Sequence, residues 1–480
     1  MGMAMAKTSN SNSACLFLLI SGLAVSGATA SEVDLTATAS SDLTYSDNID
    51  LTSQGERSGV VSIWSLGAAA VVNGNDGDLS FNYDAYQTLH SVDSSRNELF
   101  NELALFANKA LYRDNINFSA DASITNIAQS IEDNANADII SGDTIETRSL
   151  NAQLSYQSNP RGWIDFYASV DGGVTSNEDA IGDNNRFGTD ITLQNGTKAK
   201  NWFWLTDYSY NRSVARDSDE QNYDYTIEQE VGLQPMKRVS PLIRVYYEGY
   251  TDDGGSTVES GSWGPAMRYY WHKRSYFEVG YDFSFHDRDF WRGSFVFNPN
   301  SRTLVEFDYT RRFFGDAYDF SLSHQSKRMT NSITYTEEVR NFERRFLVDG
   351  QDIAEYELVK ELSINSILSL RRTSFSFEVR AMDRHSLSEV SEIGDSKLYG
   401  AALTATHRLS KNTSLSGSFN YDKNIFESPN ERDRNDYYRL YDISLTNQFS
   451  QSLSWDLSFN HANSSQYKEN RASFVLDMVY

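Results

Sequence analysis

The chain has 480 residues, carries a formal net charge of −24 and contains a single cysteine. An acidic excess of this size disfavours nucleic-acid binding, which relies on clustered Lys and Arg. The mean hydropathy is −0.53, and no stretch beyond the N-terminal segment is apolar for long enough to form a membrane helix. Aromatic residues make up 13% of the chain against six prolines, a balance that favours many strands.

Residues 1–30 have the pattern of a secretory signal peptide. Lys7 precedes an apolar run from Ala14 to Val25, and Ala28-Thr29-Ala30 supplies the small residues of a cleavage site. The run is too short to span a membrane, which argues against the alternative of an uncleaved anchor helix. Cys15 lies within it, so the predicted mature chain has neither disulfides nor thiol chemistry.

From Val33 onward, segments of about ten residues alternate between apolar and polar side chains, with turn residues between them. In the clearest stretch, from Met267 to Tyr335, one face is rich in aromatic residues and the other carries charges. Charges at this density are too costly for a sandwich core, whereas a water-filled lumen accommodates them. We therefore predict that the charged face lines a lumen, with Glu278, Asp282, Arg292, Glu306, Asp308 and Asp319 among its residues.

Short and long connections alternate along the chain. His272–Ser275 and Ser450–Ser452 are short, whereas Ile127–Thr144 and Glu338–Glu361 are long. Barrels of the outer membrane have short turns on the periplasmic side and longer loops outside. We therefore predict an all-β fold over residues 31–480: a transmembrane antiparallel up-and-down outer-membrane β-barrel of about 24 strands (range 16–26), with both termini periplasmic.

Charge differs between the two kinds of connection. Several long loops are acidic, including those with Glu132, Asp133, Asp138 and Asp143; such loops either bind divalent ions that bridge lipopolysaccharide or are simply solvated. The short turns form a basic rim, which could dock an acidic partner, attract an anionic polymer, or contact lipid head groups and keep the turns soluble. This rim comprises Arg161, Lys198, Lys237, Arg238, Lys273, Arg274, Lys327, Arg328, Arg371, Arg372 and Lys411.

The loop Glu338–Glu361 mixes charged and apolar residues. Barrels of 16–18 strands already leave an aqueous channel, and those of about 22 strands are plugged. A larger open barrel needs something to narrow it, and we consider this loop, its inward-folded neighbours or a partner protein. The alternative for Glu338–Glu361 is a mobile external loop.

After a polar loop predicted at His461–Asn470, the chain ends on an alternating segment with an aromatic last residue. This ending resembles the C-terminal strand signal of bacterial outer-membrane barrels, in which one face meets lipid and the strand closes the barrel against the first strand. The residues of this signal are Phe474, Leu476, Met478 and Tyr480.

No catalytic, cofactor-binding or metal-binding motif emerges. The seven histidines are scattered, and the chain contains no phosphate loop, dinucleotide fingerprint or Gly-x-Ser-x-Gly elbow. Glu306 and Asp308 share a face at i and i+2, which a hydrophilic pore wall explains better than an acid/base pair. We therefore predict a protein that is not an enzyme and that uses no cofactor.

Short patterns between Trp263 and Val339 point to a family. They are Asn298-Pro299-Asn300-Ser301-Arg302-Thr303, Arg311-Arg312-Phe313-Phe314-Gly315, Leu322-Ser323-His324 and Ile333-Thr334-Tyr335-Thr336-Glu337-Glu338. In these patterns the chain resembles the outer-membrane β-barrels encoded with exopolysaccharide loci and associated with the PEP-CTERM system. The resemblance implies a role in exporting or assembling surface polysaccharide, beside a periplasmic polysaccharide-export protein that lacks a membrane-spanning segment. It implies no catalytic residues.

We therefore expect an outer-membrane protein of a Gram-negative bacterium that acts as a passive export conduit for exopolysaccharide. One alternative is a general or solute-selective diffusion porin, and another is a structural barrel that scaffolds a partner. The expected partners are outer-membrane lipid, lipopolysaccharide, the barrel-assembly machinery, a periplasmic polysaccharide-export protein and a polysaccharide chain, and not nucleic acid.

Overall fold

A computed structural model describes most of the predicted mature chain. The described residues are 32–112, 115–128, 138–140, 144–158, 161–180, 182–216, 221–234, 236, 238–251, 255, 257–341, 356–387, 395–427 and 434–480. The predicted signal peptide, residues 1–30, lies outside the described residues, as does the central part of the predicted loop Glu338–Glu361, residues 342–355.

The described residues form 24 strands and one short 3₁₀ helix, η1 (Ser94–Arg96), as the periodicity of two predicts. The strands are β1 (Glu32–Ser46), β2 (Gly59–Gly74), β3 (Gly77–His90), β4 (Leu99–Leu111), β5 (Ile116–Ala128), β6 (Thr144–Gln157), β7 (Ile164–Asn177), β8 (Asn184–Asn195), β9 (Trp202–Ala215), β10 (Gln221–Leu233), β11 (Val239–Thr251), β12 (Thr257–His272), β13 (Ser275–Ser284), β14 (Phe290–Asn300), β15 (Thr303–Arg312), β16 (Gly315–Gln325), β17 (Met329–Asn341), β18 (Tyr356–Ser369), β19 (Thr373–Ser386), β20 (Asp395–Arg408), β21 (Thr413–Glu427), β22 (Arg434–Gln448), β23 (Leu453–Ser464) and β24 (Lys468–Val479).

Each strand pairs antiparallel with its neighbours in sequence, and the last strand pairs with the first. The β1–β24 register runs from Thr38↔Val479 to Ser46↔Arg471, and the backbone N–H of Tyr480 donates to the carbonyl of Ala37 at 2.9 Å. Each of the 24 described strands therefore has a paired neighbour on both sides. The predicted fold class, an up-and-down barrel of 24 strands, is confirmed.

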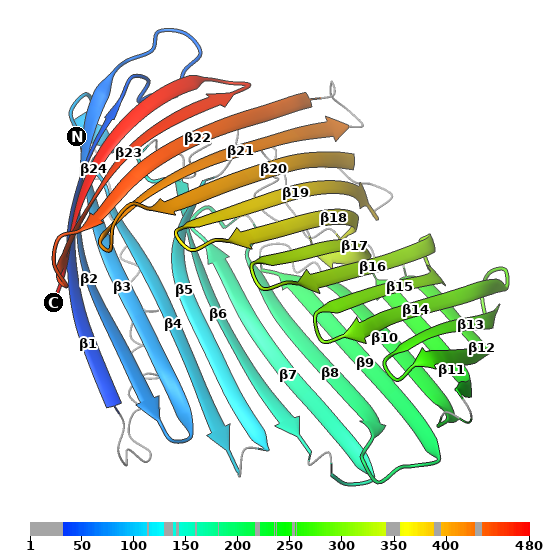
Figure 1. The fold of residues 1–480 in the computed structure, drawn as a ribbon. Helices are drawn as coiled ribbons and strands as arrows, with labels where there is room; N and C mark the ends of the chain where they lie inside the picture. The colour runs from blue at the N-terminus through cyan, green and yellow to red at the C-terminus, as the bar shows by residue number, and fades with distance from the viewer. Residues whose placement is uncertain are drawn as a thin grey trace, which may run out of the picture.

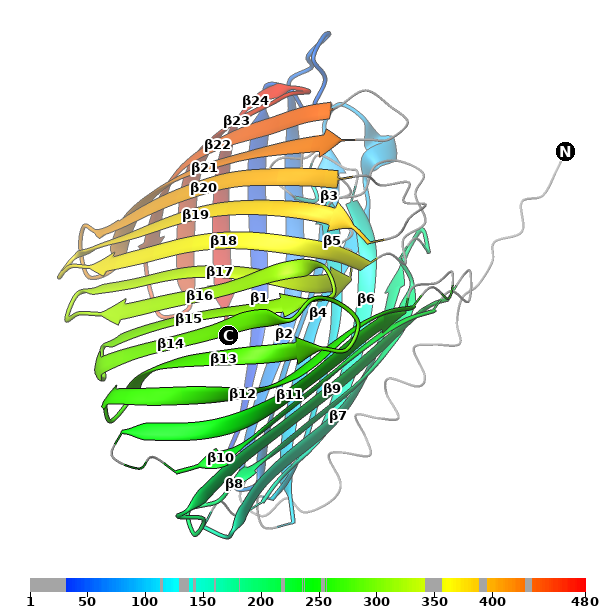
Figure 2. The same cartoon turned by 90° about the vertical axis from the view of Figure 1, so that its right-hand side faces the viewer.

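The barrel has two facing walls whose strands cross at a large angle (Figures 1 and 2). Strands β1–β9 form one wall and β17–β24 the other, and β10–β16 connect the two at one side. β24 returns beside β1 at the opposite side. The lumen is therefore the space between these two walls.

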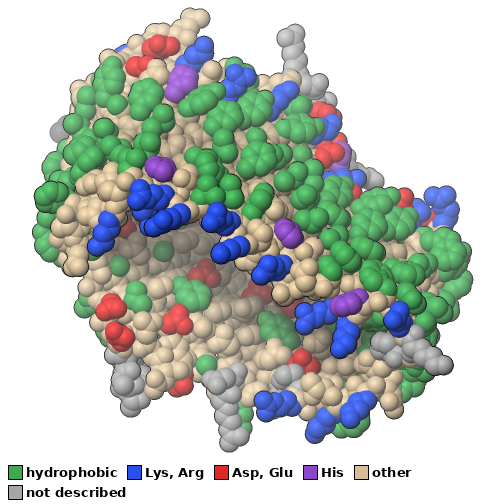
Figure 3. Space-filling view, viewed as in Figure 1, with side chains coloured by type: hydrophobic (Ala, Val, Ile, Leu, Met, Phe, Trp, Pro, Cys, Tyr) green, Lys and Arg blue, Asp and Glu red, His purple; other side chains and the backbone are tan. Residues whose placement is uncertain are grey.

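The alternating residues of each strand divide into an outer and an inner face. The outer face exposes large apolar side chains, such as Trp64 and Leu66 of β2 and Phe375 and Phe377 of β19. Figure 3 shows such side chains spread over the outside of the β17–β24 wall. Because lipid tails cannot hydrogen-bond, an apolar outer face on a fully paired sheet suits a hydrocarbon environment. None of the helices among the described residues has both the length and the apolar character needed to cross a membrane.

Most of the short connections lie at one end of the barrel, together with both ends of the described chain. The other end carries the long connections as well as the short β15–β16 and β23–β24 turns. We name the first the short-turn end and the other the long-loop end. Several strands extend further toward the long-loop end than the sequence predicts. β23 and β24 pair as far as Asn463↔Lys468, so the predicted loop His461–Asn470 is largely strand, and Glu338–Asn341 belongs to β17. Where strands project beyond the lipid, both faces are polar and the alternation disappears from the sequence although the backbone pairing continues.

The two faces of β20 offer a direct test of this architecture. Leu403 lies on the outer face and is 46% exposed, whereas its neighbour Ala402 lies on the inner face, paired with Glu378. We expect Leu403→Arg to lower the free energy of unfolding by about 2–4 kcal/mol, because the cation would sit in the hydrocarbon region. Ala402→Arg, facing water and Glu378, should lower it by much less. Urea titration of the barrel in lipid vesicles measures both variants, and equal losses would contradict this assignment of faces.

Candidate functional site on the inner wall

Three of the six predicted lumen residues lie together on the inner wall at β13 and β14. Glu278 and Asp282 of β13 and Arg292 of β14 lie on the face opposite the exposed Val279 and Trp291. All three are almost fully buried, with exposed fractions of 2%, 1% and 7%. Their burial leaves them little surface to offer to a molecule passing through the lumen.

These residues belong to a continuous ion-pair network on β10–β14. Three arginines alternate with four carboxylates, so that each buried charge has an opposite charge beside it. The contacts are Glu228–Arg244 (2.5 Å), Arg244–Asp282 (3.7 Å), Asp282–Arg292 (3.3 Å), Arg292–Glu278 (2.5 Å), Glu278–Arg268 (2.7 Å) and Arg268–Glu230 (3.2 Å).

Two glycines on the inner face make room for this network. A Cβ atom on Gly264 would lie 2.6 Å from Oδ1 of Asp282, and one on Gly280 would lie 3.2 Å from Nη2 of Arg292. Any larger side chain at Gly264 would displace the carboxylate that bridges Arg244 and Arg292. The network therefore depends on small residues between the charged ones.

The tip of the β15–β16 hairpin reaches back to the same side of the barrel. Nε of Arg312 donates to Oε2 of Glu248 on β11 at 2.9 Å, and the backbone N–H of Phe313 donates to Oε1 of the same carboxylate at 2.9 Å. The ring of Phe313 stacks on that of Tyr250, with centroids 6.3 Å apart. The hairpin is thereby tied to β11 across the three strands between them.

The other three predicted residues lie on β15 and β16, where they keep accessible surface. Asp308 pairs in register with Asp319, and the hydroxyl of Ser321 donates to Glu306 at 3.2 Å. Asp308 is exposed, and Glu306 and Asp319 are half-buried. That these residues contact a passing molecule stays a prediction.

A polar pocket of about 460 Å³ lies on the inner wall of β5–β10. Its amide and carboxylate groups are held in place by each other: Asn151 donates to Asp121 at 2.8 Å and accepts from Arg186 at 2.9 Å, and Asn211 donates to Asp224 at 3.2 Å. The sequence shows alternating polar residues here, but it does not reveal that six strands combine them into one pocket. We name this group the polar pocket; its charged and amide residues are Asp121, Asn151, Gln153, Asp171, Arg186, Asn211, Arg212 and Asp224.

Val339 of β17 also lines the polar pocket, although β17 belongs to the facing wall. The β16–β17 pairing stops at Phe320↔Tyr335, while β17 remains paired with β18 as far as Asn341↔Tyr356. The end of the β17–β18 hairpin thus leaves β16 and approaches the opposite wall. Val339, in the described first part of the predicted loop Glu338–Glu361, therefore lies close to the opposite wall. That this loop constricts the lumen stays a prediction.

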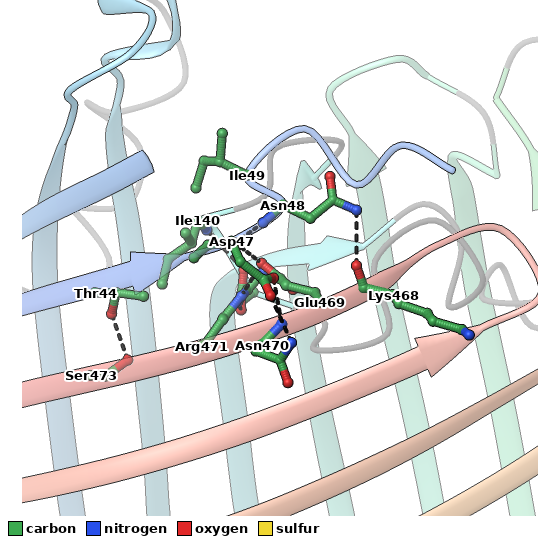
Figure 4. A network of polar contacts seen from close by, with 12 residues as sticks. Thr44, Asp47, Asn48, Ile49, Ile140, Lys468, Glu469, Asn470, Arg471 and Ser473 are labelled. Carbon is green, nitrogen blue, oxygen red and sulfur yellow. Dashed lines mark hydrogen bonds and ion pairs between the residues drawn. The ribbon is translucent and has the colours of Figure 1, made fainter. Parts of the chain in front are cut away.

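Between β5 and β6, the segment Asp138–Ile140 lies against the inner face near the β24–β1 seam, where Figure 4 shows Ile140. Arg471 of β24 forms ion pairs with Asp138 and with Glu469, the latter at 2.6 Å. Ile140 packs in an apolar cluster with Ile49, Val61 and Ile63. The sequence places Asp138 in an acidic external loop, and nothing in its pattern reveals an arginine more than 300 residues away.

Further polar contacts between β1 and β24 stabilise the seam itself (Figure 4). The backbone N–H and side-chain amide of Asn470 donate to Asp47 at 2.7 and 2.6 Å, and Ser46 donates to Glu469 at 2.6 Å. The hydroxyls of Thr44 and Ser473 lie 2.6 Å apart. These contacts fix the long-loop end of β1 and β24 and, with them, the surface on which Asp138–Ile140 rests.

The loop 47–58, which carries Ile49 to that cluster, is held by Asp50. Its carboxylate accepts from Arg57 at 2.5 Å and forms an ion pair with Arg96 at 3.2 Å. The hydrogen bond from Arg57 lowers the pKa of Asp50 below its usual value. Asp50 therefore stays ionised throughout the neutral pH range and keeps its contacts with Arg57 and Arg96, which hold the loop in place.

The closed sheet, the apolar outer face and the polar inner wall together define a membrane-spanning β-barrel of the outer-membrane class. Within the described residues, no group of three or more His, Cys, Asp or Glu side chains is placed to hold a metal ion.

No protein-family model and no curated protein matches the chain. Solved structures do match, with low sequence identity. The FrpB iron transporter from Neisseria meningitidis (F3-3 variant) is similar at a TM-score of 0.48 and 10% identity, over 93% of this chain and 82% of that one. A loop L8 deletion mutant of OmpT, an outer membrane protein of Vibrio cholerae, is similar at a TM-score of 0.36 and 8% identity, over 94% of this chain and 100% of that one. A mutant of the ferric enterobactin receptor PfeA from Pseudomonas aeruginosa is similar at a TM-score of 0.43 and 8% identity, over 93% of this chain and 80% of that one.

Removing one member of the ion-pair network should strongly destabilise the folded barrel. We expect Arg292→Met to lower the free energy of unfolding by about 3–5 kcal/mol, because Glu278 and Asp282 would remain buried without their shared partner. Lys397→Met, which breaks a solvent-exposed pair with Glu427, serves as the matched control and should have little effect. Chemical denaturation in vesicles provides the comparison. Similar small losses in both variants would show that the network contributes no more than a surface pair.

The order of loop 47–58 should depend on pH in one direction only. Because the pKa of Asp50 is lowered in the folded state, its contribution is present above the unfolded pKa of about 3.9 and is lost as the pH falls through the folded value. Amide hydrogen exchange of residues 47–58 should thus stay protected at neutral and mildly acidic pH and lose protection in strong acid. The variant Asp50→Asn should be unprotected at every pH, and a protected variant would contradict the role given to Asp50.

Proposed function

We propose that this barrel is a passive conduit through which an exopolysaccharide chain crosses the outer membrane. The observation that carries the proposal is the polar pocket on the inner wall of β5–β10. Its planar amide, carboxylate and guanidinium groups are suited to pairs of sugar hydroxyls, because each can donate or accept two hydrogen bonds side by side.

The same groups would let a chain slide. Each hydrogen bond to a sugar replaces one to water, so its net contribution is only about 0.5–1.5 kcal/mol. The groups are already held by bonds such as Asn151–Asp121, so that they need little reordering when a sugar unit arrives. A sequence of weak and similar positions guides a polymer without trapping it.

In this proposal the short-turn end faces the periplasm, as in other outer-membrane barrels, and both termini lie there. The pathway itself supplies no energy. A periplasmic export protein would deliver the chain to the short-turn end, and synthesis would drive it outward.

A second candidate function, a diffusion pore for small solutes, is favoured by one observation. The segment Asp138–Ile140 and the end of the β17–β18 hairpin both occupy space inside the barrel near the long-loop end. A constriction inside a wide barrel is also what limits the size of solutes in a porin. The two functions differ in what a cell loses when the barrel is absent.

The test is the amount of surface polymer in a strain that lacks this protein. We expect surface polysaccharide to fall and polymer to collect in the periplasm, and the full chain to restore export. Asn151→Leu combined with Asn211→Leu should restore it poorly, because two of the eight charged and amide side chains of the pocket are lost. Leu154→Ile on the outer face of β6 is the matched control and should restore it fully.

Unchanged surface polymer in the deletion strain would overturn the export function. Slower uptake of small hydrophilic solutes in that strain would then support the diffusion pore. Immunoblots of outer-membrane fractions must show equal amounts of each variant, so that a failure to restore export is not a failure to assemble.

A further inference from the structure

A second pocket lies at the short-turn end, between the turns that follow β18 and β20. Its volume is about 500 Å³, and Arg371, Arg372, Arg408 and Lys411 all line it. The rest of the lining is uncharged and mostly polar, from Ser369, Leu370, Thr373, Ser374, Thr406, Asn412, Thr413, Ser414, Thr446 and Gln448. We name these 14 residues the basic pocket.

The four cations of the basic pocket have no carboxylate partner among the residues that the structure describes. All four are exposed, and none forms an ion pair with an acidic residue in the described part of the chain. An acidic residue does contact the uncharged part of the lining: Asp456 accepts a hydrogen bond from the hydroxyl of Thr446 at 2.7 Å. Like charges gathered in a concave site repel one another, and the repulsion is relieved when an anion enters.

The backbone around the basic pocket is held in place. The N–H of Arg408 donates to the carbonyl of Arg372 at 2.7 Å, which brings the two arginines together from neighbouring strands. The N–H of Leu370 donates to Thr373 at 2.8 Å, and that of Gln448 to Asn412 at 2.9 Å. The guanidinium groups are thus carried on a fixed frame, and each can hold a carboxylate or sulfate through two parallel hydrogen bonds.

The basic pocket belongs to the inner wall and not to the lipid-facing surface. Ser374 and Thr406 are directly paired, and both lie on the same face as the inner residues Arg380 and Glu378. The adjacent Phe375 and Leu409 point outward. Figure 3 shows Lys and Arg side chains in a row along the rim of the hollow, following the short turns of Figure 1. This placement favours a molecule that enters the lumen over a lipid head group.

We propose that the basic pocket is an entry site for an anionic polysaccharide, in which the arginines bind the carboxylate or sulfate groups of successive sugar units. This inference rests on the proposed function and narrows it to acidic polymers. Uncharged side chains such as Ser414 and Gln448 would bind the hydroxyls between the charged groups. The chain would then pass from the cationic mouth toward the polar pocket, where acidic side chains would not retain it.

The proposal can be tested with the full barrel in detergent and defined probes. Isothermal titration should show that an oligogalacturonate of about ten units binds, whereas a maltooligosaccharide of equal length does not. Arg372→Gln combined with Arg408→Gln should weaken the binding by about tenfold or more, since two charge-assisted contacts are lost. Lys273→Gln combined with Arg274→Gln removes the same charge from the same end, outside the basic pocket, and should change the binding less than about twofold.

Each other outcome would overturn the proposal. Equal losses in the two double variants would mean general attraction by a basic rim. Equal binding of the charged and neutral sugars would remove the preference for acidic polymers. Stronger binding to vesicles containing phosphatidylglycerol, or to polyglutamate, than to oligogalacturonate would assign the pocket to lipid or to an acidic protein. Because these measurements use purified protein, they fail or succeed independently of the export test in the deletion strain.

Discussion

The structure depends on the hydrogen-bonded seam between β1 and β24. In a hydrocarbon environment an unpaired backbone N–H or C=O cannot form a hydrogen bond with water. An open sheet of 23 strand pairings would therefore leave two edges of unsatisfied backbone groups, at a high cost in free energy. The register from Thr38↔Val479 to Ser46↔Arg471 pairs these two edges with each other. The side chains at the long-loop end of this seam, including Asp47 and Glu469, add contacts that hold the two ends of the chain together and provide the surface for Asp138–Ile140.

The fold is predictable from the sequence because each strand carries its own signal. Alternation over about ten residues identifies strands one at a time, and an even number with alternating short and long connections implies closure. The ends of strands are less predictable, since alternation disappears where both faces are wet, as at His461 and Asn470. Arg408 was absent from the predicted basic rim for a related reason: it is the last residue of a strand and not part of a turn.

The candidate site is only partly predictable, because its parts come from distant strands. Glu278, Asp282 and Arg292 stand out as charges on an alternating segment, but their burial and their pairing with Arg244 and Arg268 depend on the register of five strands. The polar pocket combines residues of β5–β10 with Val339 of β17, and no local sequence pattern predicts that these strands lie close together. The inner wall therefore has two characters: at β10–β14 the charges neutralise one another, while at β5–β10 and at the short-turn end polar groups remain open to the lumen.

The contact of Arg312 and Phe313 with Glu248 has a mechanical consequence. It acts as a strap across β12, β13 and β14, in parallel with the ion pairs beneath it, so this arc of the barrel resists bending outward. Strands β17–β24 have fewer buried ion pairs among the described residues, the pair Arg384–Glu357 being one. We therefore infer that the arc β10–β16 resists deformation of the cross-section more strongly than the β17–β24 wall does.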